Sequence, residues 1–111
     1  MPTVRLCALM DLPFRGGRLF KNADEHGRDV LVFKRAGGEL VAYDAACPHA
    51  GALLRPENEI REVLTCTLHQ WRFSVADGQA IGIPNCALER YAVRVEDGGV
   101  WVDLPEEPPR W

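Results

Sequence analysis

Two short segments of the chain carry the residue types that bind metals. The first segment holds Cys47 and His49, and the second holds Cys66 and His69. Each segment offers one thiolate and one imidazole, and the sixteen residues 50–65 separate the two segments. A soft sulfur paired with a borderline nitrogen selects zinc or an iron–sulfur centre over calcium or magnesium. The spacing therefore predicts one metal centre held from two sides.

The way the ligands are mixed narrows the choice of metal. Zinc fingers usually bring like ligands together, with two cysteines on one turn and two histidines on another. Here the spacings are Cys-x-His and Cys-x-x-His, so each loop is mixed. Mixed loops suit a binuclear [2Fe–2S] centre with both cysteines on one iron and both histidines on the other. A zinc-binding interaction module stays open as an alternative, which a colourless protein with stoichiometric zinc would support.

The loops need a scaffold, and the local pattern predicts short β-strands. Residues 17–20 are expected to pair with 29–34, which are β-branched and aromatic, and a Gly-Gly turn then leads into 39–43. A second hairpin is predicted for 91–95 and 100–102, around an Asp-Gly-Gly turn. Further strands are expected at residues 4–9, 63–66 and 71–75, and residues 56–62 favour a single helical turn.

The residue composition changes between these two predicted hairpins. Residues 45–86 hold three of the four cysteines and two of the three histidines. We therefore predict a single all-β domain at 1–104, with an antiparallel base at 1–44 and 87–104 and an inserted metal-binding subdomain at about 45–86. Residues 105–111 are rich in proline and are expected to form a tail.

Composition excludes several classes of function. The 111 residues suit one domain, and a net charge of −3 argues against a nucleic-acid partner. No run of residues is apolar and long enough to cross a membrane, and the N-terminus lacks a signal-peptide pattern, so a cytoplasmic protein is expected. Cys7 and Cys86 are interpreted as small, buried and inert. No catalytic set is present beside the metal motifs, which favours a carrier over an enzyme.

The two segments resemble the cluster-binding motifs of Rieske proteins, and they are most similar to those of small bacterial Rieske ferredoxins. The resemblance extends to Pro48, Gly51, Trp71 and Phe73, and residues 82–86 are similar to the family's proline-containing loop. It implies a Rieske fold, an antiparallel β base resembling a sandwich or barrel with a small inserted cluster-binding subdomain. It also implies one [2Fe–2S] cluster, with the ligands Cys47, His49, Cys66 and His69.

The sequence also departs from part of the family. High-potential Rieske proteins carry a disulfide between the two loops, whereas the matching positions here are Ala52 and Leu68. They also place hydroxyl groups against the cluster sulfurs, where this chain has Trp71 and Phe73. Fewer hydrogen bonds to sulfur stabilise the reduced cluster less. We therefore expect a potential near the low end of the Rieske range, about −150 mV.

The resemblance implies a low-potential ferredoxin that takes single electrons from an NADH-dependent reductase. The recipient would be the terminal oxygenase or hydroxylase of an aromatic hydrocarbon catabolic system. Residues 81–88 look similar to ferredoxins of toluene monooxygenases, and residues 47–52 to those of ring-hydroxylating dioxygenases. A small Rieske-type subunit of a nitrite reductase is the alternative. We expect a monomer that docks at the cluster tip, through residues 50–53, Gln70 and Pro84.

Overall fold

The structure is a computed structural model that describes residues 3–12, 16–35, 37–47, 52–66 and 70–106. The strands are β1 (Thr3–Ala8), β2 (Gly16–Phe20), β3 (Val30–Lys34), β4 (Leu40–Asp44), β5 (Glu59–Ile60), β6 (Val63–Thr65), β7 (Arg72–Ser74), β8 (Arg90–Tyr91), β9 (Val93–Glu96) and β10 (Gly99–Asp103). Within the described residues the helical elements are two short 3-10 turns, Leu9–Asp11 and Pro56–Asn58. None of these described helices is long or apolar enough to cross a membrane.

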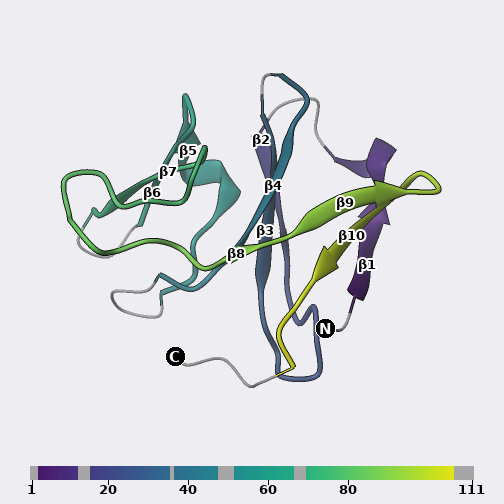
Figure 1. Ribbon diagram of the computed structural model, residues 1–111. Coiled ribbons are helices and arrows are strands. Elements are labelled where there is room, and N and C mark those ends of the chain that lie inside the picture. The colour runs from purple at the N-terminus through teal and green to yellow at the C-terminus, as the bar shows by residue number, and fades with distance from the viewer. Residues whose placement is uncertain (1–2, 13–15, 36, 48–51, 67–69, 107–111) are drawn as a thin grey trace.

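The strands form three antiparallel sheets, with the orders β1-β10-β9, β2-β3-β4-β8 and β5-β6-β7. Figure 1 shows the second sheet in the middle of the molecule, with the first on one side and the third on the other. The all-β prediction is confirmed. The insertion of β5, β6 and β7 between β4 and β8 places the third sheet inside the chain segment that carries the metal motifs.

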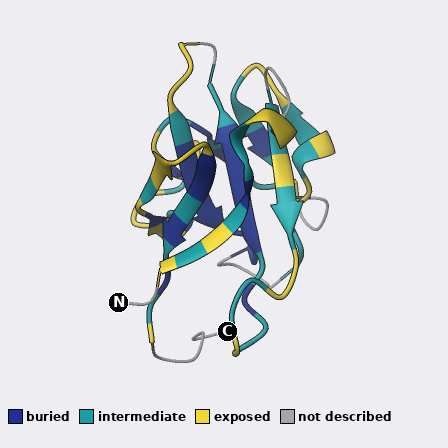
Figure 2. Cartoon of the chain, turned by 90° about the vertical axis from the view of Figure 1, so that its right-hand side faces the viewer, coloured by how far each residue is buried: buried dark blue, intermediate teal, exposed yellow. Residues whose placement is uncertain are grey.

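The central sheet is buried on both faces, which explains its continuous apolar run. Val30 and Val32 of β3 face a cluster that we call the base core, shared with the first sheet. Leu31 and Phe33 face a second cluster, the site core, shared with the third sheet. All four side chains are at most 1% exposed, and Figure 2 shows the buried residues gathered in the interior. A strand covered on both faces has a continuous run of apolar residues rather than an alternation of apolar and polar residues.

The two cores are defined by their buried members. The base core comprises Cys7, Leu12, Val30, Val32, Ala42, Tyr91, Val100, Val102 and Leu104. The site core comprises Leu31, Phe33, Val41, Tyr43, Ala45, Cys47, Leu54, Leu64, Cys66, Phe73, Val75, Ala80 and Leu88. The two cysteines proposed as ligands therefore lie in one core, on the face of the central sheet away from the base core.

The predicted hairpins are confirmed. β2 pairs with β3 from Gly16↔Lys34 to Phe20↔Val30, and β3 pairs with β4. β9 pairs with β10 around Asp97 and Gly98, whose φ angles of 50° and 73° are both left-handed. This conformation matches the right-handed twist of the flanking strands, and glycine adopts it without strain.

One local prediction is wrong, and another holds over a shorter segment. The expected strand at residues 91–95 is split, because Tyr91 pairs with β4 whereas Val93 begins the pairing with β10. The chain crosses between sheets at Ala92, whose carbonyl accepts a hydrogen bond from the N–H of Asp103. The helical turn expected within 56–62 is present as the 3-10 turn Pro56–Asn58, and it is shorter than that segment because β5 pairs with β6.

Candidate metal centre

Cys47 lies just beyond the end of β4 and is fully buried. Its N–H donates a hydrogen bond of 2.8 Å to the carbonyl of Ala52. An isolated antiparallel bridge joins Ala46 to Leu53 immediately outside that bond. The two ends of the first motif are thus fixed side by side. His49, the imidazole predicted for this motif, lies outside the described residues.

Cys66 follows β6 and is 1% exposed. Its N–H donates a hydrogen bond of 2.7 Å to the carbonyl of Trp71. Thr65 and Arg72, immediately outside the bond, are a pair of the β6–β7 ladder. The second motif therefore spans the end of a hairpin. His69 also lies outside the described residues.

The two cysteines occupy equivalent positions in similar local frames. In each case the cysteine N–H donates to the carbonyl five residues onward, and an antiparallel residue pair lies directly outside. All four cysteines of the chain are described, and all are thiols rather than disulfides. Two buried thiols in one core, each at the start of a short segment that also carries a histidine, are the donor chemistry that a two-cysteine, two-histidine [2Fe–2S] cluster needs.

A third segment joins the same core. The N–H of Ala80 donates to the carbonyl of Cys86, and Ala80 forms a bridge with Phe73 of β7. Ile83 and Cys86 pack against the site core, whereas Pro84 is exposed. Burial raises the pKa of the Cys86 thiol, and Cys47 raises it further, so Cys86 lies near the first proposed ligand.

Cys7 and Cys86, the two cysteines outside the proposed ligand set, differ in burial. Cys7 is buried in the base core, as expected. The expectation that Cys86 is buried is wrong, because it ends a surface loop and stays partly exposed. Phe73 is fully buried in the site core and Trp71 packs against it, so both act as packing residues. Ala52 packs there as well, while Leu68 lies outside the described residues.

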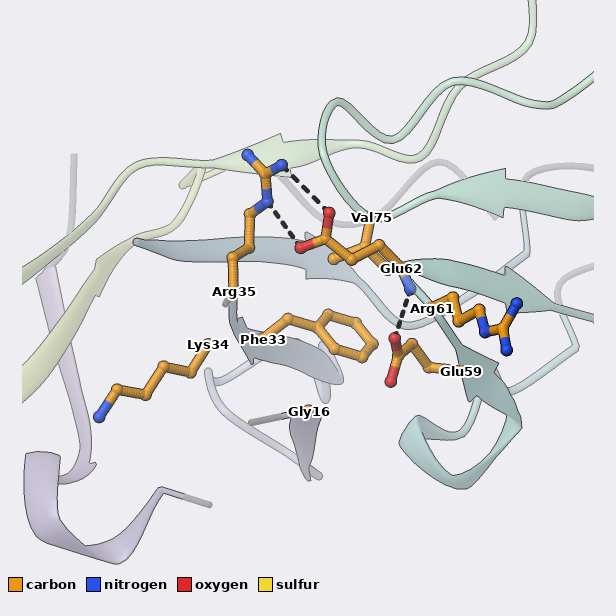
Figure 3. Close-up of a pocket in the computed structure, with 8 residues that line it drawn as sticks. All are labelled: Gly16, Phe33, Lys34, Arg35, Glu59, Arg61, Glu62 and Val75. Atoms are coloured by element: carbon orange, nitrogen blue, oxygen red, sulfur yellow. Dashed lines mark hydrogen bonds and ion pairs between the residues drawn. The ribbon is translucent and has the colours of Figure 1, made fainter. Parts of the chain in front are cut away.

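A pocket of about 340 Å³ is lined by Arg35 and Glu62, among other residues (Figure 3). Arg35 spans one side of it and donates two hydrogen bonds to Glu62, of 2.9 and 3.1 Å. Arg35 directly follows β3 at the end where Lys34 pairs with Leu40, whereas the opposite end of the β3–β4 ladder leads into Cys47. The pocket therefore lies between the central and third sheets, at a boundary that we call the sheet seam. The Arg35–Glu62 ion pair joins the two sheets across this seam.

Sequence analysis missed Asp44, the last residue of β4. Asp44 is 3% exposed, and its carboxylate accepts a hydrogen bond of 2.8 Å from the N–H of Ala46, the residue before Cys47. This is an Asx turn, in which aspartate bonds the backbone two residues onward. An aspartate three residues before a proposed ligand cysteine is the signal that could have identified it.

Comparison with known proteins relates the whole arrangement to one family. Residues 3–92 match the Rieske [2Fe-2S] domain. The chain is 38% identical over 109 residues to the ferredoxin component of the alkene monooxygenase system of Xanthobacter autotrophicus, covering 94% of this chain and 85% of that protein. It is 35% identical over 81 residues to the ferredoxin component of biphenyl 2,3-dioxygenase of Rhodococcus jostii, covering 72% and 76%. The solved ferredoxin of Sphingomonas yanoikuyae B1 has a TM-score of 0.74 at 25% identity, covering 94% and 100%.

Proposed function

The chain belongs to the Rieske [2Fe-2S] domain family, and we propose that it is the ferredoxin that carries single electrons from a reductase to a terminal oxygenase. The alkene monooxygenase and biphenyl dioxygenase relatives are ferredoxin components of their systems. The cofactor of the family is one [2Fe–2S] cluster. The observation that carries the proposal is the pair of buried thiols, Cys47 and Cys66, in one core on equivalent closed segments.

We propose that Cys47 and Cys66 bind one iron, and that His49 and His69 bind the other. The burial of both thiols supports the first half of this assignment, since a cluster on their side is shielded from water. The spacing of the histidines within the same two motifs supports the second half. We further propose that residues 45–86 form the cluster-binding subdomain on a base made of 1–44 and 87–104.

The proposed ligand set has a direct consequence for the potential. A cluster with two neutral imidazoles in place of two thiolates accepts an electron more easily than an all-cysteine cluster. Within the Rieske range, Trp71 and Phe73 supply packing but no hydroxyl donor to the cluster sulfurs. The proposed midpoint potential is therefore low, about −150 mV.

The partners proposed are an NADH-dependent reductase and the terminal oxygenase of an aromatic hydroxylation system. The biphenyl dioxygenase relative supports the aromatic system. An alkene monooxygenase is the second candidate, because the relative at 38% identity serves one. We propose docking of a monomer at the cluster tip, through residues 50–53, Gln70 and Pro84, of which Gln70 and Pro84 are exposed. A cytoplasmic location stays a prediction.

Reconstitution tests the proposal. Purified ferredoxin is combined with NADH, a reductase, and either a biphenyl-type dioxygenase or an alkene monooxygenase hydroxylase, and oxygenated product is measured. We expect product in the dioxygenase assay and its loss with Cys47→Ser, while Cys7→Ala in the base core retains it. Product in the monooxygenase assay alone would select the second candidate. Product in neither, with stable co-purification of a large sirohaem subunit, would favour the nitrite reductase alternative.

A further inference from the structure

Two charged side chains are buried where β4 passes into the Cys47 segment. Arg28 is 2% exposed and Asp44 is 3% exposed. We propose that Asp44 is a positioning residue whose carboxylate fixes the segment that presents Cys47 and holds a negative charge that lowers the reduction potential of the cluster. This inference rests on the proposed function and assigns a further residue to it.

The backbone around Cys47 depends on Asp44 at one point. The N–H groups of residues 44, 45 and 47 donate to the carbonyls of Glu89, Asp29 and Ala52, all of them backbone acceptors. The N–H of Ala46 instead donates to Oδ1 of Asp44, at 2.8 Å. Ala46 is 9% exposed, so its N–H would have little access to water without that oxygen. Leaving a buried donor without a partner destabilises the local conformation.

The second carboxylate oxygen of Asp44 also lies beside donor groups. The hydroxyl of Tyr91 donates to Oδ2 of Asp44 at 2.6 Å, and Nε of Arg28 lies 3.9 Å from the same oxygen. These partners of the Asp44 oxygens are donors, which is the environment of an ionised carboxylate rather than of a neutral acid. Burial raises the pKa of Tyr91, and its hydrogen bond to Asp44 raises it further, so the phenol remains a donor.

The positive charge of Arg28 is shared between Asp44 and a second carboxylate, that of Asp24. Nη1 of Arg28 lies 2.5 Å from Oδ2 of Asp24 and donates to the carbonyl of Pro105 at 3.2 Å. The guanidinium is closer to Asp24 than to Asp44, at 2.5 Å against 3.9 Å. One cation between two carboxylates leaves the buried group with a net negative charge.

The negative charge of Asp44 would oppose reduction of the cluster, which is the step that electron transfer requires. Reduction adds one negative charge to the cluster, and a fixed negative charge three residues from a ligand opposes it. Coulomb interactions are weakly screened in a protein interior, so the effect persists at ordinary ionic strength. The hydrogen bond to Ala46 and the charge are separable, because asparagine keeps an acceptor oxygen and lacks the charge.

Three variants and one control separate the two roles. Asp44→Asn removes the charge and keeps an acceptor for Ala46, Asp44→Ala removes both, and Tyr91→Phe removes one hydrogen bond to the carboxylate. Asp103→Asn in β10 is the matched control, since it changes the net charge equally in the first sheet. The measurements are the midpoint potential, the rate of cluster release to a chelator, and the hydrogen exchange rate of the Ala46 amide.

We expect Asp44→Asn to retain the cluster and to favour reduction by about tenfold, a positive shift of ~59 mV for a one-electron couple. Asp44→Ala should release the cluster at least tenfold faster and speed exchange of the Ala46 amide. Tyr91→Phe should shift the potential negatively, because the carboxylate loses a donor. Asp103→Asn should match the wild type in all three measurements.

The inference is overturned if Asp44→Asn has the same potential as Asp103→Asn and Asp44→Ala releases its cluster at the wild-type rate. If Asp44→Asn does not fold, Tyr91→Phe decides, and wild-type potential and Ala46 exchange in that variant would overturn it. A wild-type protein without a histidine-ligated cluster would contradict the proposed function instead. Exchange of the Ala46 amide in Asp44→Ala would then still decide the positioning role.

Discussion

The N–H of Cys66 donates a hydrogen bond of 2.7 Å to the carbonyl of Trp71, five residues onward. Cys47 makes the matching bond to Ala52, at 2.8 Å. Each bond lies beside an antiparallel residue pair, an isolated bridge for Cys47 and the β6–β7 ladder for Cys66, so two different parts of the framework present their cysteines in the same way. Both thiols are buried in the site core.

Replacement of either proposed ligand cysteine should abolish cluster binding. Cys47→Ser and Cys66→Ser are each expected to lose iron, acid-labile sulfide and visible absorbance, because serine is a poor substitute for a soft thiolate. Cys7→Ala is the matched control, since Cys7 is also buried but lies in the base core. Full iron content in Cys66→Ser, or loss of iron in Cys7→Ala alone, would contradict the ligand assignment.

Gly78 should be intolerant of a side chain. Its φ is +78°, and an added Cβ would lie 2.7 Å from Cε1 of Tyr43 in the site core. The left-handed backbone alone costs about 1–2 kcal/mol for alanine, and the clash adds to it. Gly37→Ala is the control, because nothing lies within 4 Å of its added Cβ. We expect urea denaturation to show a loss of about 2 kcal/mol or more for Gly78→Ala, and equal stability of the two variants would refute this.

The ion pair across the sheet seam should contribute little to overall stability. Glu62 and Arg35 are 35% and 29% exposed, so solvent screens the two hydrogen bonds that join them. Glu62→Gln is therefore expected to cost no more than about 1 kcal/mol. Arg94→Gln, which breaks exposed pairs within the first sheet, is the comparison. A loss of several kcal/mol for Glu62→Gln in thermal or urea unfolding would show that the seam is rigidly coupled.

Alkaline pH should destabilise the protein through its two buried tyrosines. Burial raises the pKa of both Tyr43 and Tyr91 above the ordinary value of 10. Below about pH 10 the phenols are protonated in both states, whereas at higher pH only the unfolded chain loses protons, so folding becomes less favourable. Each tyrosine contributes up to about 1.4 kcal/mol per pH unit.

Tyr91→Phe should therefore flatten the decline in stability between about pH 10 and 11, and Tyr43→Phe should flatten it less, because Tyr43 has no hydrogen bond to a carboxylate. The urea midpoint measured across this interval checks the prediction. Tyr43 donates its hydroxyl hydrogen bond to the carbonyl of Val75 rather than to a carboxylate, which makes it the matched comparison. A decline as steep in Tyr91→Phe as in the wild type would show that Tyr91 ionises normally in the folded state.

The local parts of the fold could be predicted from sequence, and the long-range parts could not. The β3–β4 and β9–β10 hairpins follow from turn glycines between apolar runs. The pairing of β1 with β10 joins residues about a hundred positions apart and leaves no local signal. The split between Tyr91 and Val93 is also non-local, because it depends on which sheet each residue meets.

The candidate site likewise has residues that could be identified from sequence and residues that could not. Cys47 and Cys66 could be identified because their spacing to histidine is itself the chemical signal. Asp44 could not be weighed without the structure, because its role depends on Arg28 and Tyr91, which come from distant parts of the chain. The partial exposure of Cys86 likewise depends on how its loop packs on the site core.

The central claim is that two cysteines and two histidines hold one [2Fe–2S] cluster. Pulsed electron paramagnetic resonance of the reduced protein, grown with ¹⁵N-labelled histidine, tests it most directly. The account predicts a rhombic signal from a red-brown protein, with hyperfine coupling to two directly bound ¹⁵N nuclei that is lost with His49→Ala or His69→Ala. A colourless protein with stoichiometric zinc, or a reduced cluster without directly bound histidine nitrogen, would contradict it.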